Sequence, residues 1–158
     1  MESQGDAKSA GNFEHYDVVI VGAGAAGIGV AIALQHSGVE NYLIVDRETI
    51  GSSFRSWPAE TRFITPSFPS NSIGMLDLNS IGVGISPAFT MRIEHPTGQD
   101  FADHLQSLSD YFELPIREKT DVLSIEKHDE FFHLEIEGGK IFAENVIWAG
   151  GEYQYPSL

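Results

Sequence analysis

The sequence predicts an α/β fold in which a parallel sheet, built on a strand–helix–strand unit, is joined to an antiparallel β-meander. Residues 16–21 and 41–46 are rich in Val and Ile without polar alternation, as buried strands of parallel sheets usually are. Between them lies a small-residue segment of helical length that stops at Gly38. Residues 122–136 instead alternate apolar and polar side chains, which is typical of antiparallel strands.

The composition restricts the classes of function. A chain of 158 residues is sized for one domain, and its 42% hydrophobic and 20% charged residues are ordinary for a globular protein. A formal net charge of −14 argues against nucleic acid or an anionic membrane as partner, since both require a basic face. Because there is no cysteine, disulfides, thiolate metal sites and a reactive protein thiol are excluded within these residues.

The N-terminal residues carry no sign of a targeting segment. Residues 1–15 lack the basic start and apolar run of a signal peptide, and no stretch of the sequence reaches the apolar length of a membrane span. We therefore expect a flexible tail over residues 1–15, a single domain over residues 16–158, no membrane partner and a cytoplasmic location.

The first structural unit is a βαβ crossover. A strand is predicted over 16–21, a helix over 25–37 with Gly38 as its C-terminal stop, and a second strand over 41–46. A unit of this kind takes about 30 residues and is right-handed in nearly all proteins.

A long irregular segment follows, over residues 47–96. It is rich in Ser, Pro and Gly, and so long a segment without periodicity is either disordered or functional. Aromatic residues argue against disorder, so we expect an ordered loop. These aromatic residues are Phe54, Trp57, Phe63, Phe68 and Phe89.

The C-terminal part of the chain provides one more helix and the meander. Thr97 is a plausible N-cap with Asp100 in the first turn, and Pro115 ends the pattern. One face of this helix carries Phe101, Leu105, Leu108 and Phe112. "EGGK" at 137–140 predicts a hairpin turn, and "NVIWAGG" at 145–151 a last apolar strand.

The junction between the first strand and helix contains a glycine motif. Gly22, Gly24 and Gly27 form G-x-G-x-x-G directly after a strand and at the start of a helix. In this pattern Gly22 permits the tight turn, Gly24 lets a pyrophosphate approach the backbone, and Gly27 lets the helix pack on the sheet. The free N–H groups and the positive dipole end of the helix then favour phosphate.

An acidic residue completes the pattern. Asp46 ends the second strand, 19 residues after Gly27, where a carboxylate can accept hydrogen bonds from a ribose diol. If the glycine turn served packing alone, the presence of the acid and of both apolar strands would be a coincidence. We therefore predict a dinucleotide site. The spacing disfavours short-chain dehydrogenases, whose G-x-x-x-G-x-G no glycine trio here satisfies. The motif itself leaves FAD and nicotinamide nucleotides as alternatives.

The order of these motifs resembles the FAD-binding half of two-dinucleotide-binding-domain flavoproteins, which include flavin-containing monooxygenases and pyridine nucleotide-disulfide oxidoreductases. The resemblance covers residues 16–158. It rests on "VVIVGAGAAGIGVA", the acid after the second strand, the loop "IGSSFRSWPAETRFITPSFPSN", the meander and "VIWAGG". The last of these is similar to a strand that usually ends in A-T-G, with Gly150 here in place of the threonine. A Rossmann-like FAD-binding domain is implied.

By position, the resemblance also implies cofactor-binding residues. Those of the pyrophosphate site and its turn are Gly22, Gly24, Ala25, Ala26, Gly27, Ala149 and Gly150. Asp46 is implied at the adenosine ribose, with Arg47 beside the adenine and the Val122 backbone at the adenine edge. Those implied near the ribityl chain and isoalloxazine are Ser53, Phe54 and Trp57.

Three of these assignments have rivals. Arg47 could pair with the 2′-phosphate of NADP, although the adjacent Asp46 would repel that phosphate, or it could be a surface residue. Phe54 and Trp57 could equally be core aromatics.

The family reaction is hydride transfer from NADPH or NADH to FAD, then onward to oxygen or a disulfide. Without cysteine, a monooxygenase-like enzyme is favoured, and a bacillithiol-disulfide-reductase-like enzyme is the alternative. The second G-x-G-x-x-G of the family and its final FAD-binding segment are not in this sequence. We therefore expect the incomplete, FAD-binding part of a larger enzyme, without the nicotinamide-binding domain and the C-terminal FAD segment. The resemblance is compatible with a homodimer and leaves the catalytic residues and the small-molecule substrate unspecified.

Two further hypotheses remain: a nicotinamide-binding module without flavin, and a non-catalytic remnant with an empty site. A metal site is not predicted, because His128 and His133 lie in a hairpin and no histidine pair has i, i+4 spacing on a predicted helix. The acids of residues 121–137 are interpreted as the solvated face of the meander.

Overall fold

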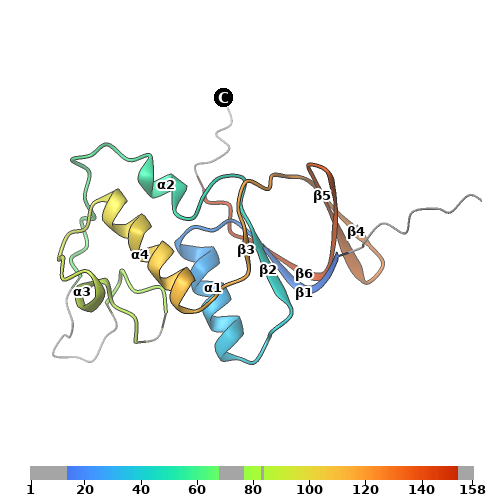
Figure 1. The fold of residues 1–158 in the computed structure, drawn as a ribbon, viewed down its shortest axis with the longest axis horizontal. Helices are drawn as coiled ribbons and strands as arrows, with labels where there is room; N and C mark the ends of the chain where they lie inside the picture. The colour runs from blue at the N-terminus through green and yellow to red at the C-terminus, as the bar shows by residue number, and fades with distance from the viewer. Residues whose placement is uncertain (1–13, 68–76, 83, 153–158) are drawn as a thin grey trace, which may run out of the picture.

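The computed structural model describes residues 14–67, 77–82 and 84–152. Figure 1 shows one six-stranded sheet, in the order β3-β2-β1-β6-β5-β4, with the helices toward one end and the β4–β5 hairpin at the other. The predicted α/β fold, a parallel sheet with an antiparallel meander, is confirmed. Of the predicted tail, residues 1–13 lie outside the described residues.

Strand β1 (Glu14–Val21) is central to the parallel part of the sheet. It pairs in parallel with β2 (Tyr42–Val45) on one side and with β6 (Gly139–Trp148) on the other. The strand begins two residues earlier than predicted, because Glu14 and His15 pair with residues of β6. A two-residue strand that was not predicted, β3 (Ile116–Arg117), extends the sheet beyond β2.

Helix α1 (Ala25–His36) connects β1 to β2, and its end is closed as predicted. Gly38 has a φ of 81°, and its N–H donates to the Gln35 carbonyl at 3.1 Å. The Val39 N–H donates to the Leu34 carbonyl at 3.0 Å. This pair of bonds satisfies two of the last carbonyls of the helix, which is why a glycine able to adopt positive φ follows it.

Helix α4 (Gly98–Tyr111) begins with a reciprocal cap. The Thr97 hydroxyl accepts from the Asp100 N–H at 3.1 Å, and the Asp100 carboxylate accepts from the Thr97 N–H at 2.9 Å. The predicted N-cap is therefore confirmed. The helix ends at Tyr111, one residue before Phe112 and four before Pro115.

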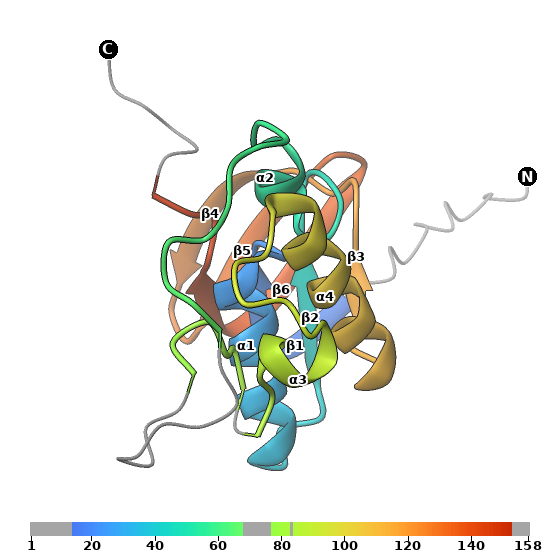
Figure 2. The same ribbon diagram turned by 90° about the vertical axis from the view of Figure 1, so that its left-hand side faces the viewer.

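The core lies on both faces of the sheet. Side chains of alternate residues of β1, such as Ile20, pack with Ile28 of α1 and Leu105 of α4, and Figure 2 shows these helices in front of the sheet. The other alternate residues, such as Val19, pack with Leu134 of the meander. Because both faces are covered, the central strand is apolar throughout residues 18–21, as the sequence predicted.

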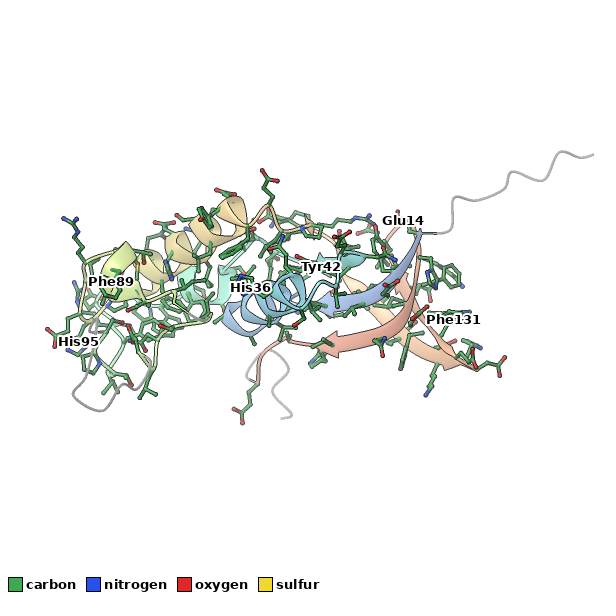
Figure 3. The ribbon with its side chains drawn as sticks, turned by 90° about the horizontal axis from the view of Figure 1, so that it is seen from below. Glu14, His36, Tyr42, Phe89, His95 and Phe131 are labelled. Carbon is green, nitrogen blue, oxygen red and sulfur yellow. The ribbon has the colours of Figure 1, made fainter. Side chains whose placement is uncertain are left out.

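The described part of the loop over residues 47–96 is ordered around aromatic rings. It contains two short helices that were not predicted, α2 (Ser52–Arg55) and α3 (Pro87–Thr90). Four rings lie with centroids 4.6–5.9 Å apart; they belong to Phe54, Trp57, Phe63 and Phe101. Phe89 does not join this cluster, because α3 leaves it 63% exposed at the end of the molecule opposite Glu14 (Figure 3). Phe68 lies outside the described residues.

The meander is continuous with the parallel sheet. Strands β4 (Val122–His128) and β5 (Phe131–Ile136) pair antiparallel, and the turn predicted at "EGGK" leads from β5 into β6. Strand β6 is a single element that contains most of the predicted last strand: it pairs antiparallel with β5 and parallel with β1. Among the described residues no helix is both long and apolar enough to cross a membrane.

A buried histidine of α4 should make the free energy of unfolding depend on pH. His104 is 3% exposed, its Nδ1 lies 3.1 Å from the Thr90 hydroxyl, and its Nε2 has no hydrogen-bond partner within the described residues. Burial lowers the pKa of the imidazole below its ordinary 6.5. The unfolded chain therefore takes up this proton at a higher pH than the folded one. The free energy of unfolding should then decrease as the pH falls below 6.5.

We expect a decrease of up to about 1.4 kcal/mol per pH unit from this residue. Urea unfolding at several pH values between about 7 and 5.5 measures it. His104→Gln should flatten the profile, whereas the exposed control His36→Gln should keep the wild-type slope. Equal slopes in both variants would contradict the assignment.

Candidate functional site

A cavity of about 440 Å³ opens at the carboxyl ends of β1, β2 and β6. Ligands of open α/β sheets bind at this edge, and the volume lies in the range of small-molecule sites. Its walls come from the β1–α1 turn, the segment after β2, helix α2, the loop before β4 and the end of β6. Segments far apart in the sequence therefore meet here.

Two glycines of the β1–α1 turn are required by packing. Gly22 has a φ of 116°, and a Cβ at this residue would overlap the Ala149 carbonyl at the end of β6. A Cβ at Gly27 would overlap the Gly22 carbonyl oxygen. The first turn of α1 thus lies directly against the end of β1, as the predicted roles of both glycines require.

Gly24 differs from them, because nothing lies within 4 Å of the position that its Cβ would occupy. It is the N-cap of α1 in an extended conformation, with no side-chain cap and no acidic residue in the first turn. The first N–H groups of a helix have no partner within the helix. An open backbone at a helix N-terminus is suited to a phosphate group.

Asp46 lies beside this turn and is held by the backbone. Its carboxylate accepts from the Ala23 N–H at 2.6 Å and from the Glu48 N–H at 2.7 Å. The Thr120 N–H, from the loop before β4, donates to the Asp46 carbonyl at 2.8 Å. Because each carboxylate oxygen can accept a second hydrogen bond, Asp46 is fixed in place and still able to accept from a hydroxyl group.

An ion pair lies at the rim. The Glu48 carboxylate accepts from the Lys119 ammonium, which holds the pKa of Glu48 below its ordinary value. The Lys119 N–H also donates to the Glu48 carbonyl at 3.0 Å. The loop before β4 is thus attached to the segment after β2, and both segments are positioned beside the cavity.

Most of the residues predicted for the site line this cavity. They are Gly22, Gly24, Ala25, Ala26, Asp46, Arg47, Ser53, Phe54, Val122, Ala149 and Gly150. Two do not: Gly27 lies behind the turn, and Trp57 lies in the aromatic cluster with Phe54. Contact of each of these residues with a cofactor stays a prediction.

The structure adds lining residues that the sequence reasoning did not name. They are Val21, Val45, Glu48, Ser52, Ser56, Thr120, Asp121, Trp148 and Gly151. Val21 and Val45 could have been predicted from the sequence, because Val21 directly precedes the glycine motif and Val45 directly precedes Asp46. The sequence holds no comparable signal for Thr120 and Asp121, because their loop is positioned by hydrogen bonds to residues 46–50, some 70 residues earlier.

The role of Asp46 in the turn predicts an effect on stability without any ligand. Asp46→Ala removes the acceptor of two backbone N–H groups, and we expect a loss of about 2 kcal/mol in the free energy of unfolding. Chemical denaturation measures this loss. Glu48→Ala, which removes only an exposed pairing partner, should unfold like the wild type. Equal stabilities of the two variants would show that the Asp46 carboxylate does not hold the turn.

A family model described as pyridine nucleotide-disulphide oxidoreductase matches residues 19–158. The chain belongs to this family. The match includes the glycine turn, Asp46 and the end of β6, and so spans every segment that forms the cavity.

Two curated relatives match nine-tenths of the chain. An uncharacterized CzcO-like oxidoreductase of Geobacillus kaustophilus is 29% identical over 145 residues, 90% of this chain and 38% of the relative. The FAD-dependent urate hydroxylase of Xanthomonas campestris is 31% identical over 165 residues, 89% of this chain and 33% of the relative. The chain thus spans between a third and two-fifths of the length of these relatives.

Solved structures share the fold. The bacillithiol disulfide reductase Bdr of Staphylococcus aureus matches 88% of this chain and 39% of its own, with a TM-score of 0.75 and 19% identity. The flavin-containing monooxygenase of Stenotrophomonas maltophilia matches 92% of this chain and 42% of its own, with a TM-score of 0.68 and 21% identity. The resemblance inferred from the sequence motifs is therefore confirmed at the level of family and fold.

Proposed function

We propose that the cavity binds FAD, and that the chain is the FAD-binding part of an NAD(P)H-dependent, monooxygenase-like flavoprotein. The observation that carries this proposal is the open backbone at Gly24, the N-cap of α1. The carboxylate of Asp46 lies beside it, bonded to the N–H of the preceding residue, Ala23. Family membership supports the proposal, as does the urate hydroxylase relative, which is named as FAD-dependent.

The described residues suit the adenosine diphosphate part of FAD. The first N–H groups of α1 would bind the pyrophosphate, and Asp46 would accept from the adenosine ribose. Arg47 and Val122 would lie beside the adenine. Ser53 and Phe54, on α2, would lie toward the ribityl chain and the flavin. The protein thus binds and orients, and FAD supplies the hydride and oxygen chemistry when it is bound.

Charge favours FAD over NADP as the resident nucleotide. Asp46 is held where the ribose hydroxyls would lie, and a 2′-phosphate there would be repelled by its carboxylate. An unphosphorylated adenosine ribose instead offers hydroxyl donors to that carboxylate. This supports Arg47 beside the adenine rather than on a 2′-phosphate.

The finer parts of the proposal concern the whole enzyme. We infer NADPH or NADH as co-substrate, a small-molecule substrate and a cytoplasmic location, with a homodimer compatible with the family. These residues contain no cysteine for an internal redox disulfide, and on that basis we propose oxygen as the electron acceptor. A second candidate is a bacillithiol-disulfide-reductase-like enzyme, which the disulphide in the family description and the fold of the Staphylococcus aureus reductase support. The two candidates can be separated in an enzyme that contains this domain: a monooxygenase-like enzyme should consume oxygen, and a disulfide reductase should release thiol.

The test is reconstitution. The purified chain is incubated with excess FAD, separated from free cofactor by gel filtration and examined for flavin absorption, with circular dichroism to establish that it is folded. We expect FAD to elute with the protein, and NADP⁺ in a parallel sample to elute separately. Folded protein that retains no FAD, or that retains NADP⁺ instead, would contradict the proposal.

A further inference from the structure

Trp148 lies at the end of β6, lines the cavity and remains 53% exposed. It pairs in register with Val21, so the two side chains lie on the same face of the sheet. The preceding residue, Ile147, packs against the cluster that contains α1, and Val146 packs against the cluster that contains the meander. The Trp148 indole is therefore on the meander side of the cavity.

This side of the cavity is apolar, unlike the glycine turn. Val21, Val45 and Val122 all line the cavity and all belong to the meander-side cluster. With the Trp148 indole they provide aliphatic and aromatic surface on this side of the cavity. The cavity thus has a backbone N–H region suited to phosphate and an apolar region suited to a flat ring.

The residue two positions later is fitted to the indole. A Cβ at Gly150 would lie 2.9 Å from Cζ2, 3.0 Å from Cε2 and 3.3 Å from Nε1 of Trp148. Any larger residue would have to displace the ring. This contact gives a physical reason for Gly150 in "VIWAGG", where the resembling strand carries threonine: the glycine accompanies the tryptophan.

We propose that Trp148 is a positioning residue whose indole stacks on the adenine of the bound nucleotide. The inference rests on the proposed function and deepens it by naming the residue that recognises the base. Tryptophan combines a large apolar surface with a ring that stacks on other flat rings, and every base offers such a face. A core role for Trp148 alone is not consistent with its 53% exposure or with its place on the cavity wall.

Fluorescence makes the contact observable. The chain has two tryptophans, and Trp57 lies in the aromatic cluster outside the cavity lining. In the Trp57→Phe variant, emission comes from Trp148 alone. Titration with ADP, which carries the base and the pyrophosphate but no flavin, should quench this emission. Titration with inorganic pyrophosphate, which lacks the base, should leave it nearly unchanged.

Affinity gives the second measurement. Trp148→Ala should bind ADP about 5- to 100-fold more weakly than the wild type, and Trp148→Phe should recover most of the loss because it keeps an aromatic face. Inorganic pyrophosphate should bind to all three proteins alike. Circular dichroism and thermal unfolding verify that each variant is folded.

Two results would overturn the inference while the proposed function stands: FAD and ADP bind equally well to wild type and Trp148→Ala, or pyrophosphate loses as much affinity as ADP. In the second case Trp148 would shape the whole cavity rather than recognise the base. If the wild type takes up no FAD, the proposed function itself fails, and the inference fails with it.

The close approach of Trp148 to Gly150 gives a second variant. Gly150→Thr should displace the indole, reduce the quenching by ADP and weaken ADP binding about as much as Trp148→Ala does. The clash should also make Gly150→Thr less stable to heat than the wild type. In Trp148→Val/Gly150→Thr the clash is absent, so this thermal stability should be regained while the affinity for ADP stays low. Wild-type ADP affinity in the double variant would overturn the stacking role.

Discussion

Gly24→Val is expected to weaken FAD binding by about 100-fold or more and to leave the fold intact. Gly24 has a φ of −85° and a ψ of −170°, an extended conformation open to any residue, and its Cβ position has no neighbour within 4 Å. A valine would therefore project into the cavity at the N-terminus of α1, where the pyrophosphate is proposed to lie. A hydrogen bond to a charged group is worth about 1.5–3 kcal/mol, so displacing the pyrophosphate from two N–H groups would weaken binding by about 100-fold or more.

Two readouts decide this prediction. Equilibrium titration with FAD measures the affinity, and thermal unfolding without ligand establishes that the variant folds like the wild type. Undiminished FAD affinity in folded Gly24→Val would place the cofactor elsewhere. A strong loss of stability would instead show that Gly24 serves packing, contrary to the open space around it.

Gly27→Ala, in contrast, should lower the stability of the fold, because a single methyl group at this residue overlaps the Gly22 carbonyl oxygen. Helix α1 would have to move away from the end of β1, where neither element can shift without disturbing the core that contains Ile20 and Ile28. We expect a loss of about 3 kcal/mol, at the upper end of overpacking effects. For a chain of this size that lowers Tm by roughly 6–12 °C.

Gly24→Ala is the matched control, since it adds the same methyl group three residues earlier in the same turn. Its stability should change by less than about 1 kcal/mol, because the added Cβ meets open space. The contrast between the two variants in thermal unfolding separates the glycine required by packing from the glycine required by the ligand. Equal Tm values for both would refute the distinction.

The parts of the fold that could be predicted are those coded by neighbouring residues. Gly38 ends α1 and Thr97 caps α4 because each bonds to backbone groups only a few residues away. The glycine turn and Asp46 were recognisable for the same reason, since their spacing follows from one βαβ unit. These are local constraints, and a single sequence records them directly.

Long-range contacts account for what was missed. Strand β3 has only two residues and exists because it pairs with β2, some 70 residues earlier, so no periodicity marks it. Thr120 and Asp121 reach the cavity through the attachment of their loop to the segment after β2. Trp148 was visible as part of "VIWAGG", but its position on the cavity wall depends on the register of β6 against β1.

The aromatic loop was predictable only in part. Phe54 and Trp57 had two interpretations, cofactor contact and core, and the structure places both rings in one cluster with Phe63. Phe54 alone of the pair also lines the cavity. Composition predicted order in this loop, but the direction of each ring depends on α4, where Gly98 lies against the Phe54 carbonyl.

FAD is proposed to bind at the β1–α1 turn. The most direct test of this proposal is to record backbone amide NMR signals of the isotope-labelled chain during titration with FAD. We expect the largest shifts at Gly24, Ala25 and Ala26, with further shifts at Asp46. Saturable shifts confined to another part of the molecule, or no shifts at FAD concentrations that saturate related flavoproteins, would contradict it.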